Sequence, residues 1–263
     1  MQVDLNADIG EASTPRDELV ELALLRLVTS VNIACGGHAG DVATMRRLVI
    51  VSRGRGLRIG AHPGYPDREH QGRVPLSLPE SEIHQLVREQ IEALGAIAVA
   101  AGARLTHVKP HGALYNQAAT DRRLAAAVAA AVRDVDPALV LVGPCGSQLL
   151  EAGAEAGLVV WPEAFVDRMY RPDGTLVPRS EAGALITDPK VAAERALQLV
   201  LEGSLPADDG TVLRLRPRTL CIHADTPGAV AIARQVHDAL VGRGIEIGTG
   251  AARASAAGNG RRS

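Results

Sequence analysis

The feature that most constrains the fold of this chain is a repeated alternation of short apolar segments with longer amphipathic segments. The short segments match buried β-strands, and the longer ones carry apolar residues three and four positions apart, as helices do. We predict seven strands, at residues 3–8, 30–35, 57–62, 105–109, 138–142, 158–161 and 219–223, with 245–247 as a candidate eighth. We predict helices between them, at residues 18–27, 42–52, 77–98, 122–135, 147–156, 189–201 and 229–241.

Alternating strands and helices of this kind form a parallel sheet, which either closes into a barrel or stays open. The two common nucleotide-binding open sheets carry glycine-rich signatures, but here no GxGxxG follows the first strand and no Walker sequence is present. The length of 263 residues also matches a β/α barrel, which typically has about 250. We therefore predict a single β/α-barrel domain over residues 1–250. Residues 251–263 are small, polar and basic, and we predict a disordered tail there.

The composition argues against several classes of function. Aromatic residues make up only 2% of the chain, the net charge is −2, and the folded region has no lysine and arginine cluster, so no nucleic-acid partner is expected. No apolar stretch reaches the roughly 18 residues of a membrane span, so no membrane partner is expected. The three cysteines form no CxxC pair and the first residues do not match a signal peptide, so we expect free thiols and a cytoplasmic location.

The first predicted strand has an unusual polar face. Asp4, Asn6 and Asp8 share one side of the strand, because side chains alternate across it. An exposed edge strand would account for this pattern. In a closed barrel, however, the same face points inward, and Asp8 then lies at the mouth, where barrel active sites form.

Two histidines end neighbouring strands. His38 follows the pair Gly36-Gly37 directly after the second strand, and His62 ends the third strand. A lone histidine is more often structural than catalytic. Two histidines at equivalent positions converge on the same barrel mouth, so we take both as candidate catalytic residues.

The densest signal is the segment His107-Val108-Lys109-Pro110-His111. His107 and Lys109 share one face of the strand, and Pro110 ends the strand so that His111 turns into the loop. A lysine that points into a barrel is costly unless it meets an anion or a carboxylate. Its partner is either a structural carboxylate of the first strand or a ligand, and in both cases the lysine lies in the polar mouth.

Further candidates follow at the same rim. Tyr115 and Asn116 come within a turn of that segment, and His223 ends the last strand. The long loop over residues 165–180, which contains Asp167 and is preceded by Glu163, is rich in charge, as a lid or a recognition loop would be, although a solvated loop has the same composition. Its Arg168 and Arg179 are suited to gripping a carboxylate with two parallel hydrogen bonds.

Five strings of this sequence, in this order, resemble the LamB/YcsF family, and the resemblance runs from residue 3 to about residue 247. The strings are Asp4–Glu11, Asn32–Asp41, Gly60–Pro63, His107–Asn116 and Leu176–Ser180. Five strings in order are highly specific. The chain departs from the family's usual pattern at Gly37, Met169, Ala224 and residues 70–73. These departures concern the shape of the pocket and its loops more than its polar chemistry.

The resemblance implies a β/α barrel akin to the glycoside hydrolase/deacetylase type. It also implies an activity: cleavage of 5-oxoproline (pyroglutamate) to glutamate, coupled to ATP hydrolysis and carried out with two partner subunits called B and C. The chain has no glycine loop that would cradle phosphates. This absence fits ATP as a co-substrate that is bound mainly by the partners.

Within that reaction the polar residues take candidate roles. A base activates water, a cation holds the phosphate or the oxyanion, and an arginine holds the substrate carboxylate. The catalytic candidates are Asp8 or His38 as base, Lys109 as cation, and His62 and His111 as acid or orienting groups. The substrate-binding candidates are Asn6, Glu11, His107, Tyr115, Asn116, Arg168, Arg179 and His223.

Two alternatives stay open. A metal-dependent deacetylase-like hydrolase would use Asp8, His38 and His62 as ligands of a divalent ion, since one carboxylate and two histidines suit zinc or a similar metal. A non-catalytic scaffold protein would need no functional mouth at all. Whether a metal is bound is left undecided by these residues.

Overall fold

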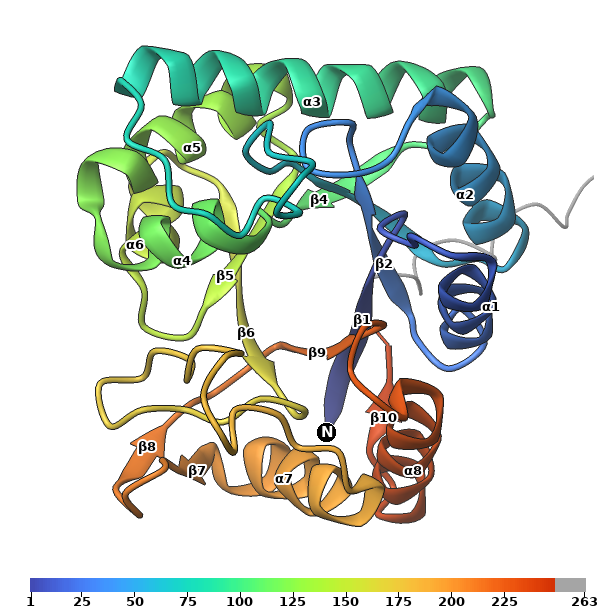
Figure 1. Cartoon of the computed structure of the whole chain (residues 1–263), viewed down its shortest axis with the longest axis vertical. Coiled ribbons are helices and arrows are strands. Elements are labelled where there is room, and N and C mark those ends of the chain that lie inside the picture. Colours follow the sequence, from blue (N-terminus) through green and yellow to red (C-terminus); the bar gives the residue numbers. More distant parts are fainter. Residues whose placement is uncertain (249–263) are drawn as a thin grey trace, which may run out of the picture.

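The computed structural model describes residues 1–248 and shows seven parallel strands closed into a barrel, with helices around it (Figure 1). The strands of the ring are β1 (Gln2–Ile9), β2 (Ser30–Ala34), β3 (Arg58–His62), β4 (Leu105–Val108), β5 (Val140–Pro144), β6 (Val159–Phe165) and β9 (Thr219–His223). Each strand pairs with the next one in this order, and β9 returns to pair with residues 4–8 of β1. The predicted β/α barrel with seven parallel strands is confirmed.

Helices cover the outside of the ring. They are α1 (Pro15–Leu24), α2 (Val42–Gly54), α3 (Glu80–Ala100), α4 (Gly112–Thr120), α5 (Arg122–Val135), α6 (Gln148–Glu155), α7 (Pro189–Glu202) and α8 (Ala229–Gly242). Several begin after a side chain that accepts a hydrogen bond from the first turn, as Asp41 does before α2 and Ser147 before α6. Over residues 1–248, no helix combines the length and the apolar character that crossing a membrane requires.

The two faces of β1 show how the interior is divided. Residues 3, 5, 7 and 9 belong to the apolar core between the ring and the helices. Residues 4, 6 and 8 point into the barrel, where Asp4 accepts hydrogen bonds from the hydroxyls of Ser30 and Thr219, both at 2.6 Å. The polar face predicted for the first strand therefore lines the barrel interior, and the edge-strand alternative is wrong.

The candidate eighth strand lies outside the ring. β10 (Glu246–Ile247) pairs in parallel with the first two residues of β1. The carbonyl of Val3 accepts a hydrogen bond from Gly248, and the carbonyl of Leu5 accepts one from Thr29, just before β2. Because both carbonyls lie on the same edge of β1, β10 and β2 occupy successive stretches of that edge. β10 thus extends the base of the barrel without entering the ring.

The structure contains two features that the sequence patterns do not indicate, the helix α4 and an antiparallel hairpin. The hairpin joins β7 (Ser204–Pro206) to β8 (Val212–Arg214). Strands of three residues are too short to show an alternating pattern. α4 has only nine residues and starts at a glycine with φ of 53°, so its first turn gives no helical signal either.

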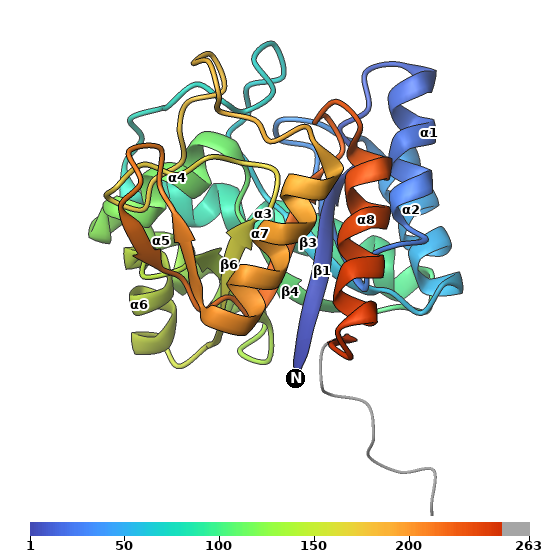
Figure 2. The ribbon, with the colours of Figure 1, turned by 90° about the horizontal axis from the view of Figure 1, so that it is seen from below.

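The C-terminal ends of the parallel strands form one mouth of the barrel. Figure 2 shows the start of β1 at one end of the molecule and the long connections of residues 63–79 and 166–188 at the other. The second connection is folded by two isolated bridges, which join Arg168 to Leu185 and Tyr170 to Leu176. Residues 251–263, for which we predict a disordered tail, lie outside the described part of the chain.

Gly60 makes room for a histidine inside the barrel. A Cβ atom at residue 60 would lie only 2.2 Å from Nε2 of His107. In its absence the His107 ring lies against β3, and its Nε2 hydrogen-bonds to Oδ1 of Asn32 at 2.8 Å. The residue is 2% exposed, and burial lowers the pKa of His107 to about 3, so the ring is neutral.

We expect Gly60→Ala to lower the free energy of unfolding by about 1–3 kcal/mol, the usual cost of overpacking. The added methyl group must displace the His107 ring from Asn32. Urea unfolding at neutral pH measures the effect. Gly54→Ala, at the end of α2, is the matched control, because a Cβ atom there meets nothing within 4 Å and alanine favours a helix. Equal stability of the two variants would contradict the role of Gly60.

Candidate functional site

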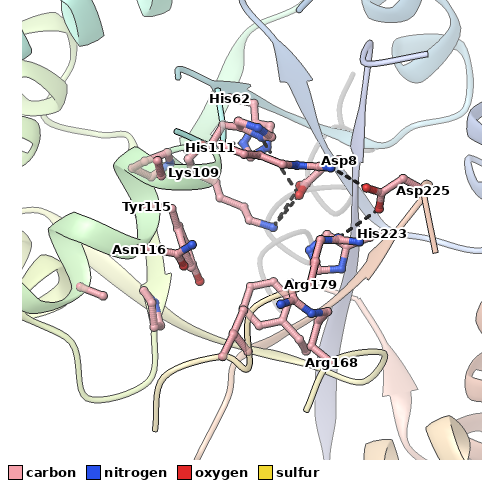
Figure 3. Close-up of a pocket in the computed structure, with 18 of the residues that line it drawn as sticks. Asp8, His62, Lys109, His111, Tyr115, Asn116, Arg168, Arg179, His223 and Asp225 are labelled. Carbon is pink, nitrogen blue, oxygen red and sulfur yellow. Dashed lines mark hydrogen bonds and ion pairs between the residues drawn. The ribbon is translucent and has the colours of Figure 1, made fainter. Parts of the chain in front are cut away.

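A cavity of about 640 Å³ opens at the C-terminal mouth of the barrel (Figure 3). Its size is that of a small-molecule site. Of the sequence-predicted residues, those that line it are Asp8, Glu11, His62, Lys109, His111, Tyr115, Asn116, Arg168, Arg179 and His223. The structure thus brings most of the predicted site together. Asn6, His38 and His107 are not part of this lining, and all three are buried.

Lys109 lies at the floor of the cavity with its charge compensated. Its Nζ atom lies 3.0 Å from Oδ1 of Asp8, 3.0 Å from Oε1 of Glu163 and 3.1 Å from Sγ of Cys221. Among these contacts the hydrogen bonds go to Asp8 and Cys221, and the contact with Glu163 is an ion pair. The partner of the inward lysine is therefore a carboxylate of the first strand, joined by a second carboxylate from β6.

The charged groups around Lys109 stabilise one another in their ionised states. Burial by itself would lower the pKa of Lys109, but Asp8 and Glu163 outweigh it and hold that pKa well above its ordinary value. Burial would also raise the pKa of Asp8, but His62 and Lys109 hold it well below its ordinary value. At neutral pH Asp8 is thus a carboxylate of low basicity, which makes it a poor general base.

Glu163 connects the floor of the cavity to the layer beneath. Its Oε1 atom accepts a hydrogen bond from the amide of Asn6 at 2.9 Å, and its Oε2 accepts one from the hydroxyl of Tyr115 at 2.7 Å. The carbonyl of Asn6 in turn accepts from Asn32 at 2.8 Å. The polar groups of Asn6 and Tyr115 are therefore engaged inside the protein.

Three histidines and a glutamate form a compact cluster in the cavity wall. Oε1 of Glu11 lies 2.9 Å from Nε2 of His38, 3.0 Å from Nδ1 of His111 and 3.5 Å from Nε2 of His62. The rings of His38 and His111 are stacked with their centroids 3.6 Å apart. The four residues come from the ends of β1 to β4, which converge at the mouth of the barrel.

The same cluster sets the charges of its members. Burial lowers the pKa of His38 to about 4, so this ring is neutral at pH 7. Burial would raise the pKa of Glu11, but His111 and His38 outweigh it and hold that pKa well below its ordinary value. Glu11 is consequently a charged carboxylate in contact with three imidazoles.

The cluster in the structure differs from the ligand set predicted for a metal ion, Asp8 with His38 and His62. The carboxylate that groups with the three histidines is Glu11. Asp8 lies 3.4 Å from Nε2 of His62 but is also bound by Lys109 at 3.0 Å and by Asn32 at 2.8 Å. A second group in the described structure, Asp8 with Cys221 and His223, also brings ligand atoms within 4.8 Å of one another. It shares Asp8 with the lysine. The histidine cluster is therefore the stronger metal candidate.

A buried aspartate holds His223 in place at the opposite wall. Asp167 accepts hydrogen bonds from Nδ1 of His223 at 3.0 Å, from its backbone N–H at 3.0 Å and from the hydroxyl of Thr226 at 2.8 Å. Burial would raise the pKa of Asp167, but His223 outweighs it and lowers the pKa to about 2. With Nδ1 donating to this carboxylate, Nε2 is the ring nitrogen left for a substrate.

Arginines gather near this wall. Arg179 lies 3.0 Å from one oxygen of Asp225, and Arg73 lies 2.6 Å from the other. Arg168 is 7% exposed and donates from Nη2 to the carbonyl of Val177, but its buried Nε has no hydrogen-bond partner within residues 1–248. Burial and the nearby Arg179 lower the pKa of Arg168 to about 10, which still leaves it cationic at neutral pH. Arg168 is thus a cation of the cavity lining with an unused donor.

The strands, motifs and cavity residues described above lie in a segment that matches a known protein family. The model of the LamB/YcsF family matches residues 3–255. The chain belongs to the LamB/YcsF family. All five strings on which we base the resemblance fall within the matched segment, and the predicted family is confirmed.

Relatives of this LamB/YcsF chain cover nearly all of it. A protein from Methylococcus capsulatus, named as the A subunit of 5-oxoprolinase, is 52% identical over 245 residues, which are 93% of this chain and 94% of the relative. A protein of the same name from Heliobacterium modesticaldum is 50% identical over 250 residues, 95% of this chain and 98% of the relative. The crystal structure of the lactam utilization protein from Thermus thermophilus has 44% sequence identity and a TM-score of 0.87, and covers 95% of this chain and 100% of that one.

Two site residues of this LamB/YcsF chain, Glu163 and Asp167, appear among the sequence-based candidates only as charged residues in or just before the long loop, with no role assigned. Glu163 lies in β6, which runs to residue 165, whereas the apolar pattern predicts a strand that ends at residue 161. The alternation of Trp161, Glu163 and Phe165 is the signal that identifies Glu163 as an inward residue. Asp167 lies beyond the strand, and only the tertiary structure brings it to His223.

We expect Asp167→Asn to lower the free energy of unfolding by about 2 kcal/mol at pH 6. Folding lowers the pKa of this carboxyl from 3.8 to about 2, so its contribution is complete above pH 5 and is lost as the pH falls toward 2. Urea unfolding at pH 6, 5, 4 and 3 should show the difference from wild type shrinking. Asp238→Asn, an exposed carboxylate on α8, is the control. A difference that stays constant with pH would count against the ion pair.

Proposed function

We propose that this chain is the A subunit of an ATP-dependent 5-oxoprolinase. In this role it cleaves 5-oxo-L-proline (pyroglutamate) to L-glutamate, coupled to ATP hydrolysis, together with partner subunits B and C. The observation that carries the proposal is the 50–52% identity, over 93–95% of the chain, to relatives that are named as this component of 5-oxoprolinase. The similarity to a lactam utilization protein supports the same chemistry, since pyroglutamate is a lactam.

The arginine wall suits the one charged group of the substrate. Pyroglutamate carries an α-carboxylate, and a guanidinium group binds a carboxylate through parallel hydrogen bonds. Within the described part of the chain the buried Nε of Arg168 has no hydrogen-bond partner, and Arg179 lies nearby with Asp225 as its partner. We assign Arg168 as the main carboxylate clamp and Arg179 as its second member.

ATP makes the ring opening feasible. A lactam resists water because the amide is stabilised by resonance, and a five-membered ring has little strain to release. Transfer of the γ-phosphoryl group to the amide oxygen makes the ring carbon electrophilic. Water then adds to that carbon, the ring C–N bond breaks, and a second water releases phosphate. Because the sequence has no glycine loop that would cradle ATP, we assign phosphoryl transfer to the partner subunits and ring opening to this chain.

His223 is the base that the geometry favours for activating water. Its Nδ1 is held by Asp167 and its Nε2 is available at the cavity, an arrangement that fixes both tautomer and orientation. Asp8, one of the two sequence-based candidates, has a pKa held well below the ordinary value and so accepts a proton poorly. His38, the other, is buried behind the cavity wall.

Lys109 contributes its positive charge to the site more than it contributes a free hydrogen-bond donor. Its ammonium group already hydrogen-bonds to Asp8 and Cys221 and forms an ion pair with Glu163. A buried ammonium still lowers the energy of negative charge that develops on the substrate oxygen above it, because the field acts through a medium of low polarity. The use of ATP and the three free cysteines of the chain support a cytoplasmic location.

A reconstitution assay tests the proposed function. The purified chain is mixed with candidate subunits B and C, alone and together, and pyroglutamate-dependent release of ADP and glutamate is measured. We expect glutamate only from the complete mixture, because this chain supplies ring opening and the partners supply phosphoryl transfer. ATP hydrolysis without glutamate release when this chain is left out would fit the same division. Full activity without this chain would exclude the proposal.

Arg168→Met tests the carboxylate clamp within the active mixture. We expect KM for pyroglutamate to rise by about 10-fold or more, as expected for the loss of a charged hydrogen bond of about 1.5–3 kcal/mol. Arg171→Met is the matched control, because Arg171 lies on the same loop, pairs with Glu181 at 2.7 Å and is not part of the cavity lining. Equal KM values for the two variants would show that another residue holds the carboxylate.

One alternative function has support in a specific observation. The cluster of Glu11 with three histidines suits a metal-dependent hydrolase of the deacetylase type. That function predicts hydrolysis of an N-acetyl substrate by this chain alone, without ATP or partners. The same purified protein can be assayed for both reactions, and acetate release without any glutamate from the complete mixture would favour the alternative. A non-catalytic scaffold predicts that Arg168→Met changes neither reaction.

A further inference from the structure

We propose that His38, His62, His111 and Glu11 bind one divalent transition-metal ion, with Zn²⁺ as the best match. The inference rests on the geometry of this cluster and goes beyond the proposed function, since it holds whether or not pyroglutamate is the substrate. Neutral imidazoles with one carboxylate are the ligands that Zn²⁺ takes in proteins.

The spacing of the four groups is that of ligands around a common centre. Four ligands at about 2.05 Å from a tetrahedral Zn²⁺ lie about 3.3 Å from one another. Oε1 of Glu11 lies 2.9, 3.0 and 3.5 Å from the three histidine nitrogens, and Nδ1 of His111 lies 3.0 Å from Nε2 of His62. All four ligand atoms lie within 4.8 Å of one another. A small inward or outward shift of the side chains is enough to complete the coordination.

The backbone orients two of the rings with their lone pairs toward this centre. Nδ1 of His62 lies 2.7 Å from the carbonyl of Lys109, and Nε2 of His111 lies 2.8 Å from the carbonyl of Gln71. A carbonyl only accepts, so each of these nitrogens carries a proton, and the other nitrogen of each ring is the one that faces the centre of the cluster. Metal-binding histidines are fixed in this way, by donating their second N–H to a carbonyl or a carboxylate.

Without a cation the cluster shares few protons among many acceptors. Nδ1 of His111 lies 3.0 Å from both Nε2 of His62 and Oε1 of Glu11. Because one N–H serves both of these acceptors, neither receives a full hydrogen bond. A divalent ion satisfies all the converging lone pairs at once, which a proton cannot do.

The backbone of two nearby glycines packs against the cluster and holds its histidine rings in position. A Cβ atom at Gly64 would lie 2.5 Å from Nδ1 of His38, and one at Gly72 would lie 2.7 Å from Cβ of His38. Both glycines therefore pack directly against the ligands, and a larger residue would displace them. Such a rigid surround preorganises a metal site. The side chain of Glu11 is 19% exposed and borders the cavity, so a bound ion would lie beside the substrate and supply Lewis-acid polarisation there.

Metal titration of untagged protein, freed of metal with a chelator and then dialysed, tests the site. We expect isothermal titration with Zn²⁺ to give one ion per chain, and Co²⁺ to give the intense visible absorption of a four-coordinate ion. Glu11→Gln and His62→Gln should each weaken Zn²⁺ binding by about tenfold or more, since loss of even an outer partner of a metal ligand costs about 10–100-fold. Circular dichroism confirms that the variants are folded.

His223→Gln is the matched control, because His223 lines the same cavity but belongs to the other group of potential ligands. Unchanged Zn²⁺ affinity in this variant supports the proposed cluster. Loss of binding in His223→Gln with retention in Glu11→Gln would move the metal to the second group and overturn the proposal. Clearly sub-stoichiometric binding to wild type, with histidine NMR signals unchanged by Zn²⁺, would also overturn it. Because no substrate is used, these outcomes are independent of the reconstitution assay.

Discussion

The interior of this barrel depends on the compensation of one charge, the ammonium group of Lys109. Asp8 and Glu163 each lie 3.0 Å from it. Removing one member of such a buried group leaves another charge without its partner, which costs several kcal/mol of folding free energy. Asn6 and Tyr115 then satisfy the remaining oxygens of Glu163. The interiors of such barrels are usually filled by branched apolar side chains. Here the interior is polar, and the apolar core lies between the strands and the helices.

This polar floor separates two walls of different chemistry. The histidine cluster is built from the ends of β1 to β4, whereas Arg168 and Arg179 follow β6 and His223 ends β9. A small substrate that carries a carboxylate and a reactive amide would place its carboxylate at the arginines and its amide at the wall formed by the histidine cluster.

Much of the fold and part of the site could be predicted before the structure. The alternation of apolar and amphipathic segments predicts all seven strands of the ring, and the polar face of residues 4–8 predicts an inward orientation. Strand-end positions also predict His62, Lys109 and His223 as cavity residues. The inward position of Glu163 is not predicted, because its strand extends beyond its apolar run, and the role of Asp167 is not predicted, because its contact with His223 spans 56 residues of chain.

Local patterns at the ends of strands are enough to predict the barrel, the family and most of the residues at its mouth. The folded structure is needed to know which of these residues act together. It pairs Asp8 with Lys109, places Glu11 among the histidines, and leaves the buried Nε of Arg168 without a hydrogen-bond partner within residues 1–248. Charge compensation and ligand geometry depend on distances across the barrel, which no single segment of sequence contains.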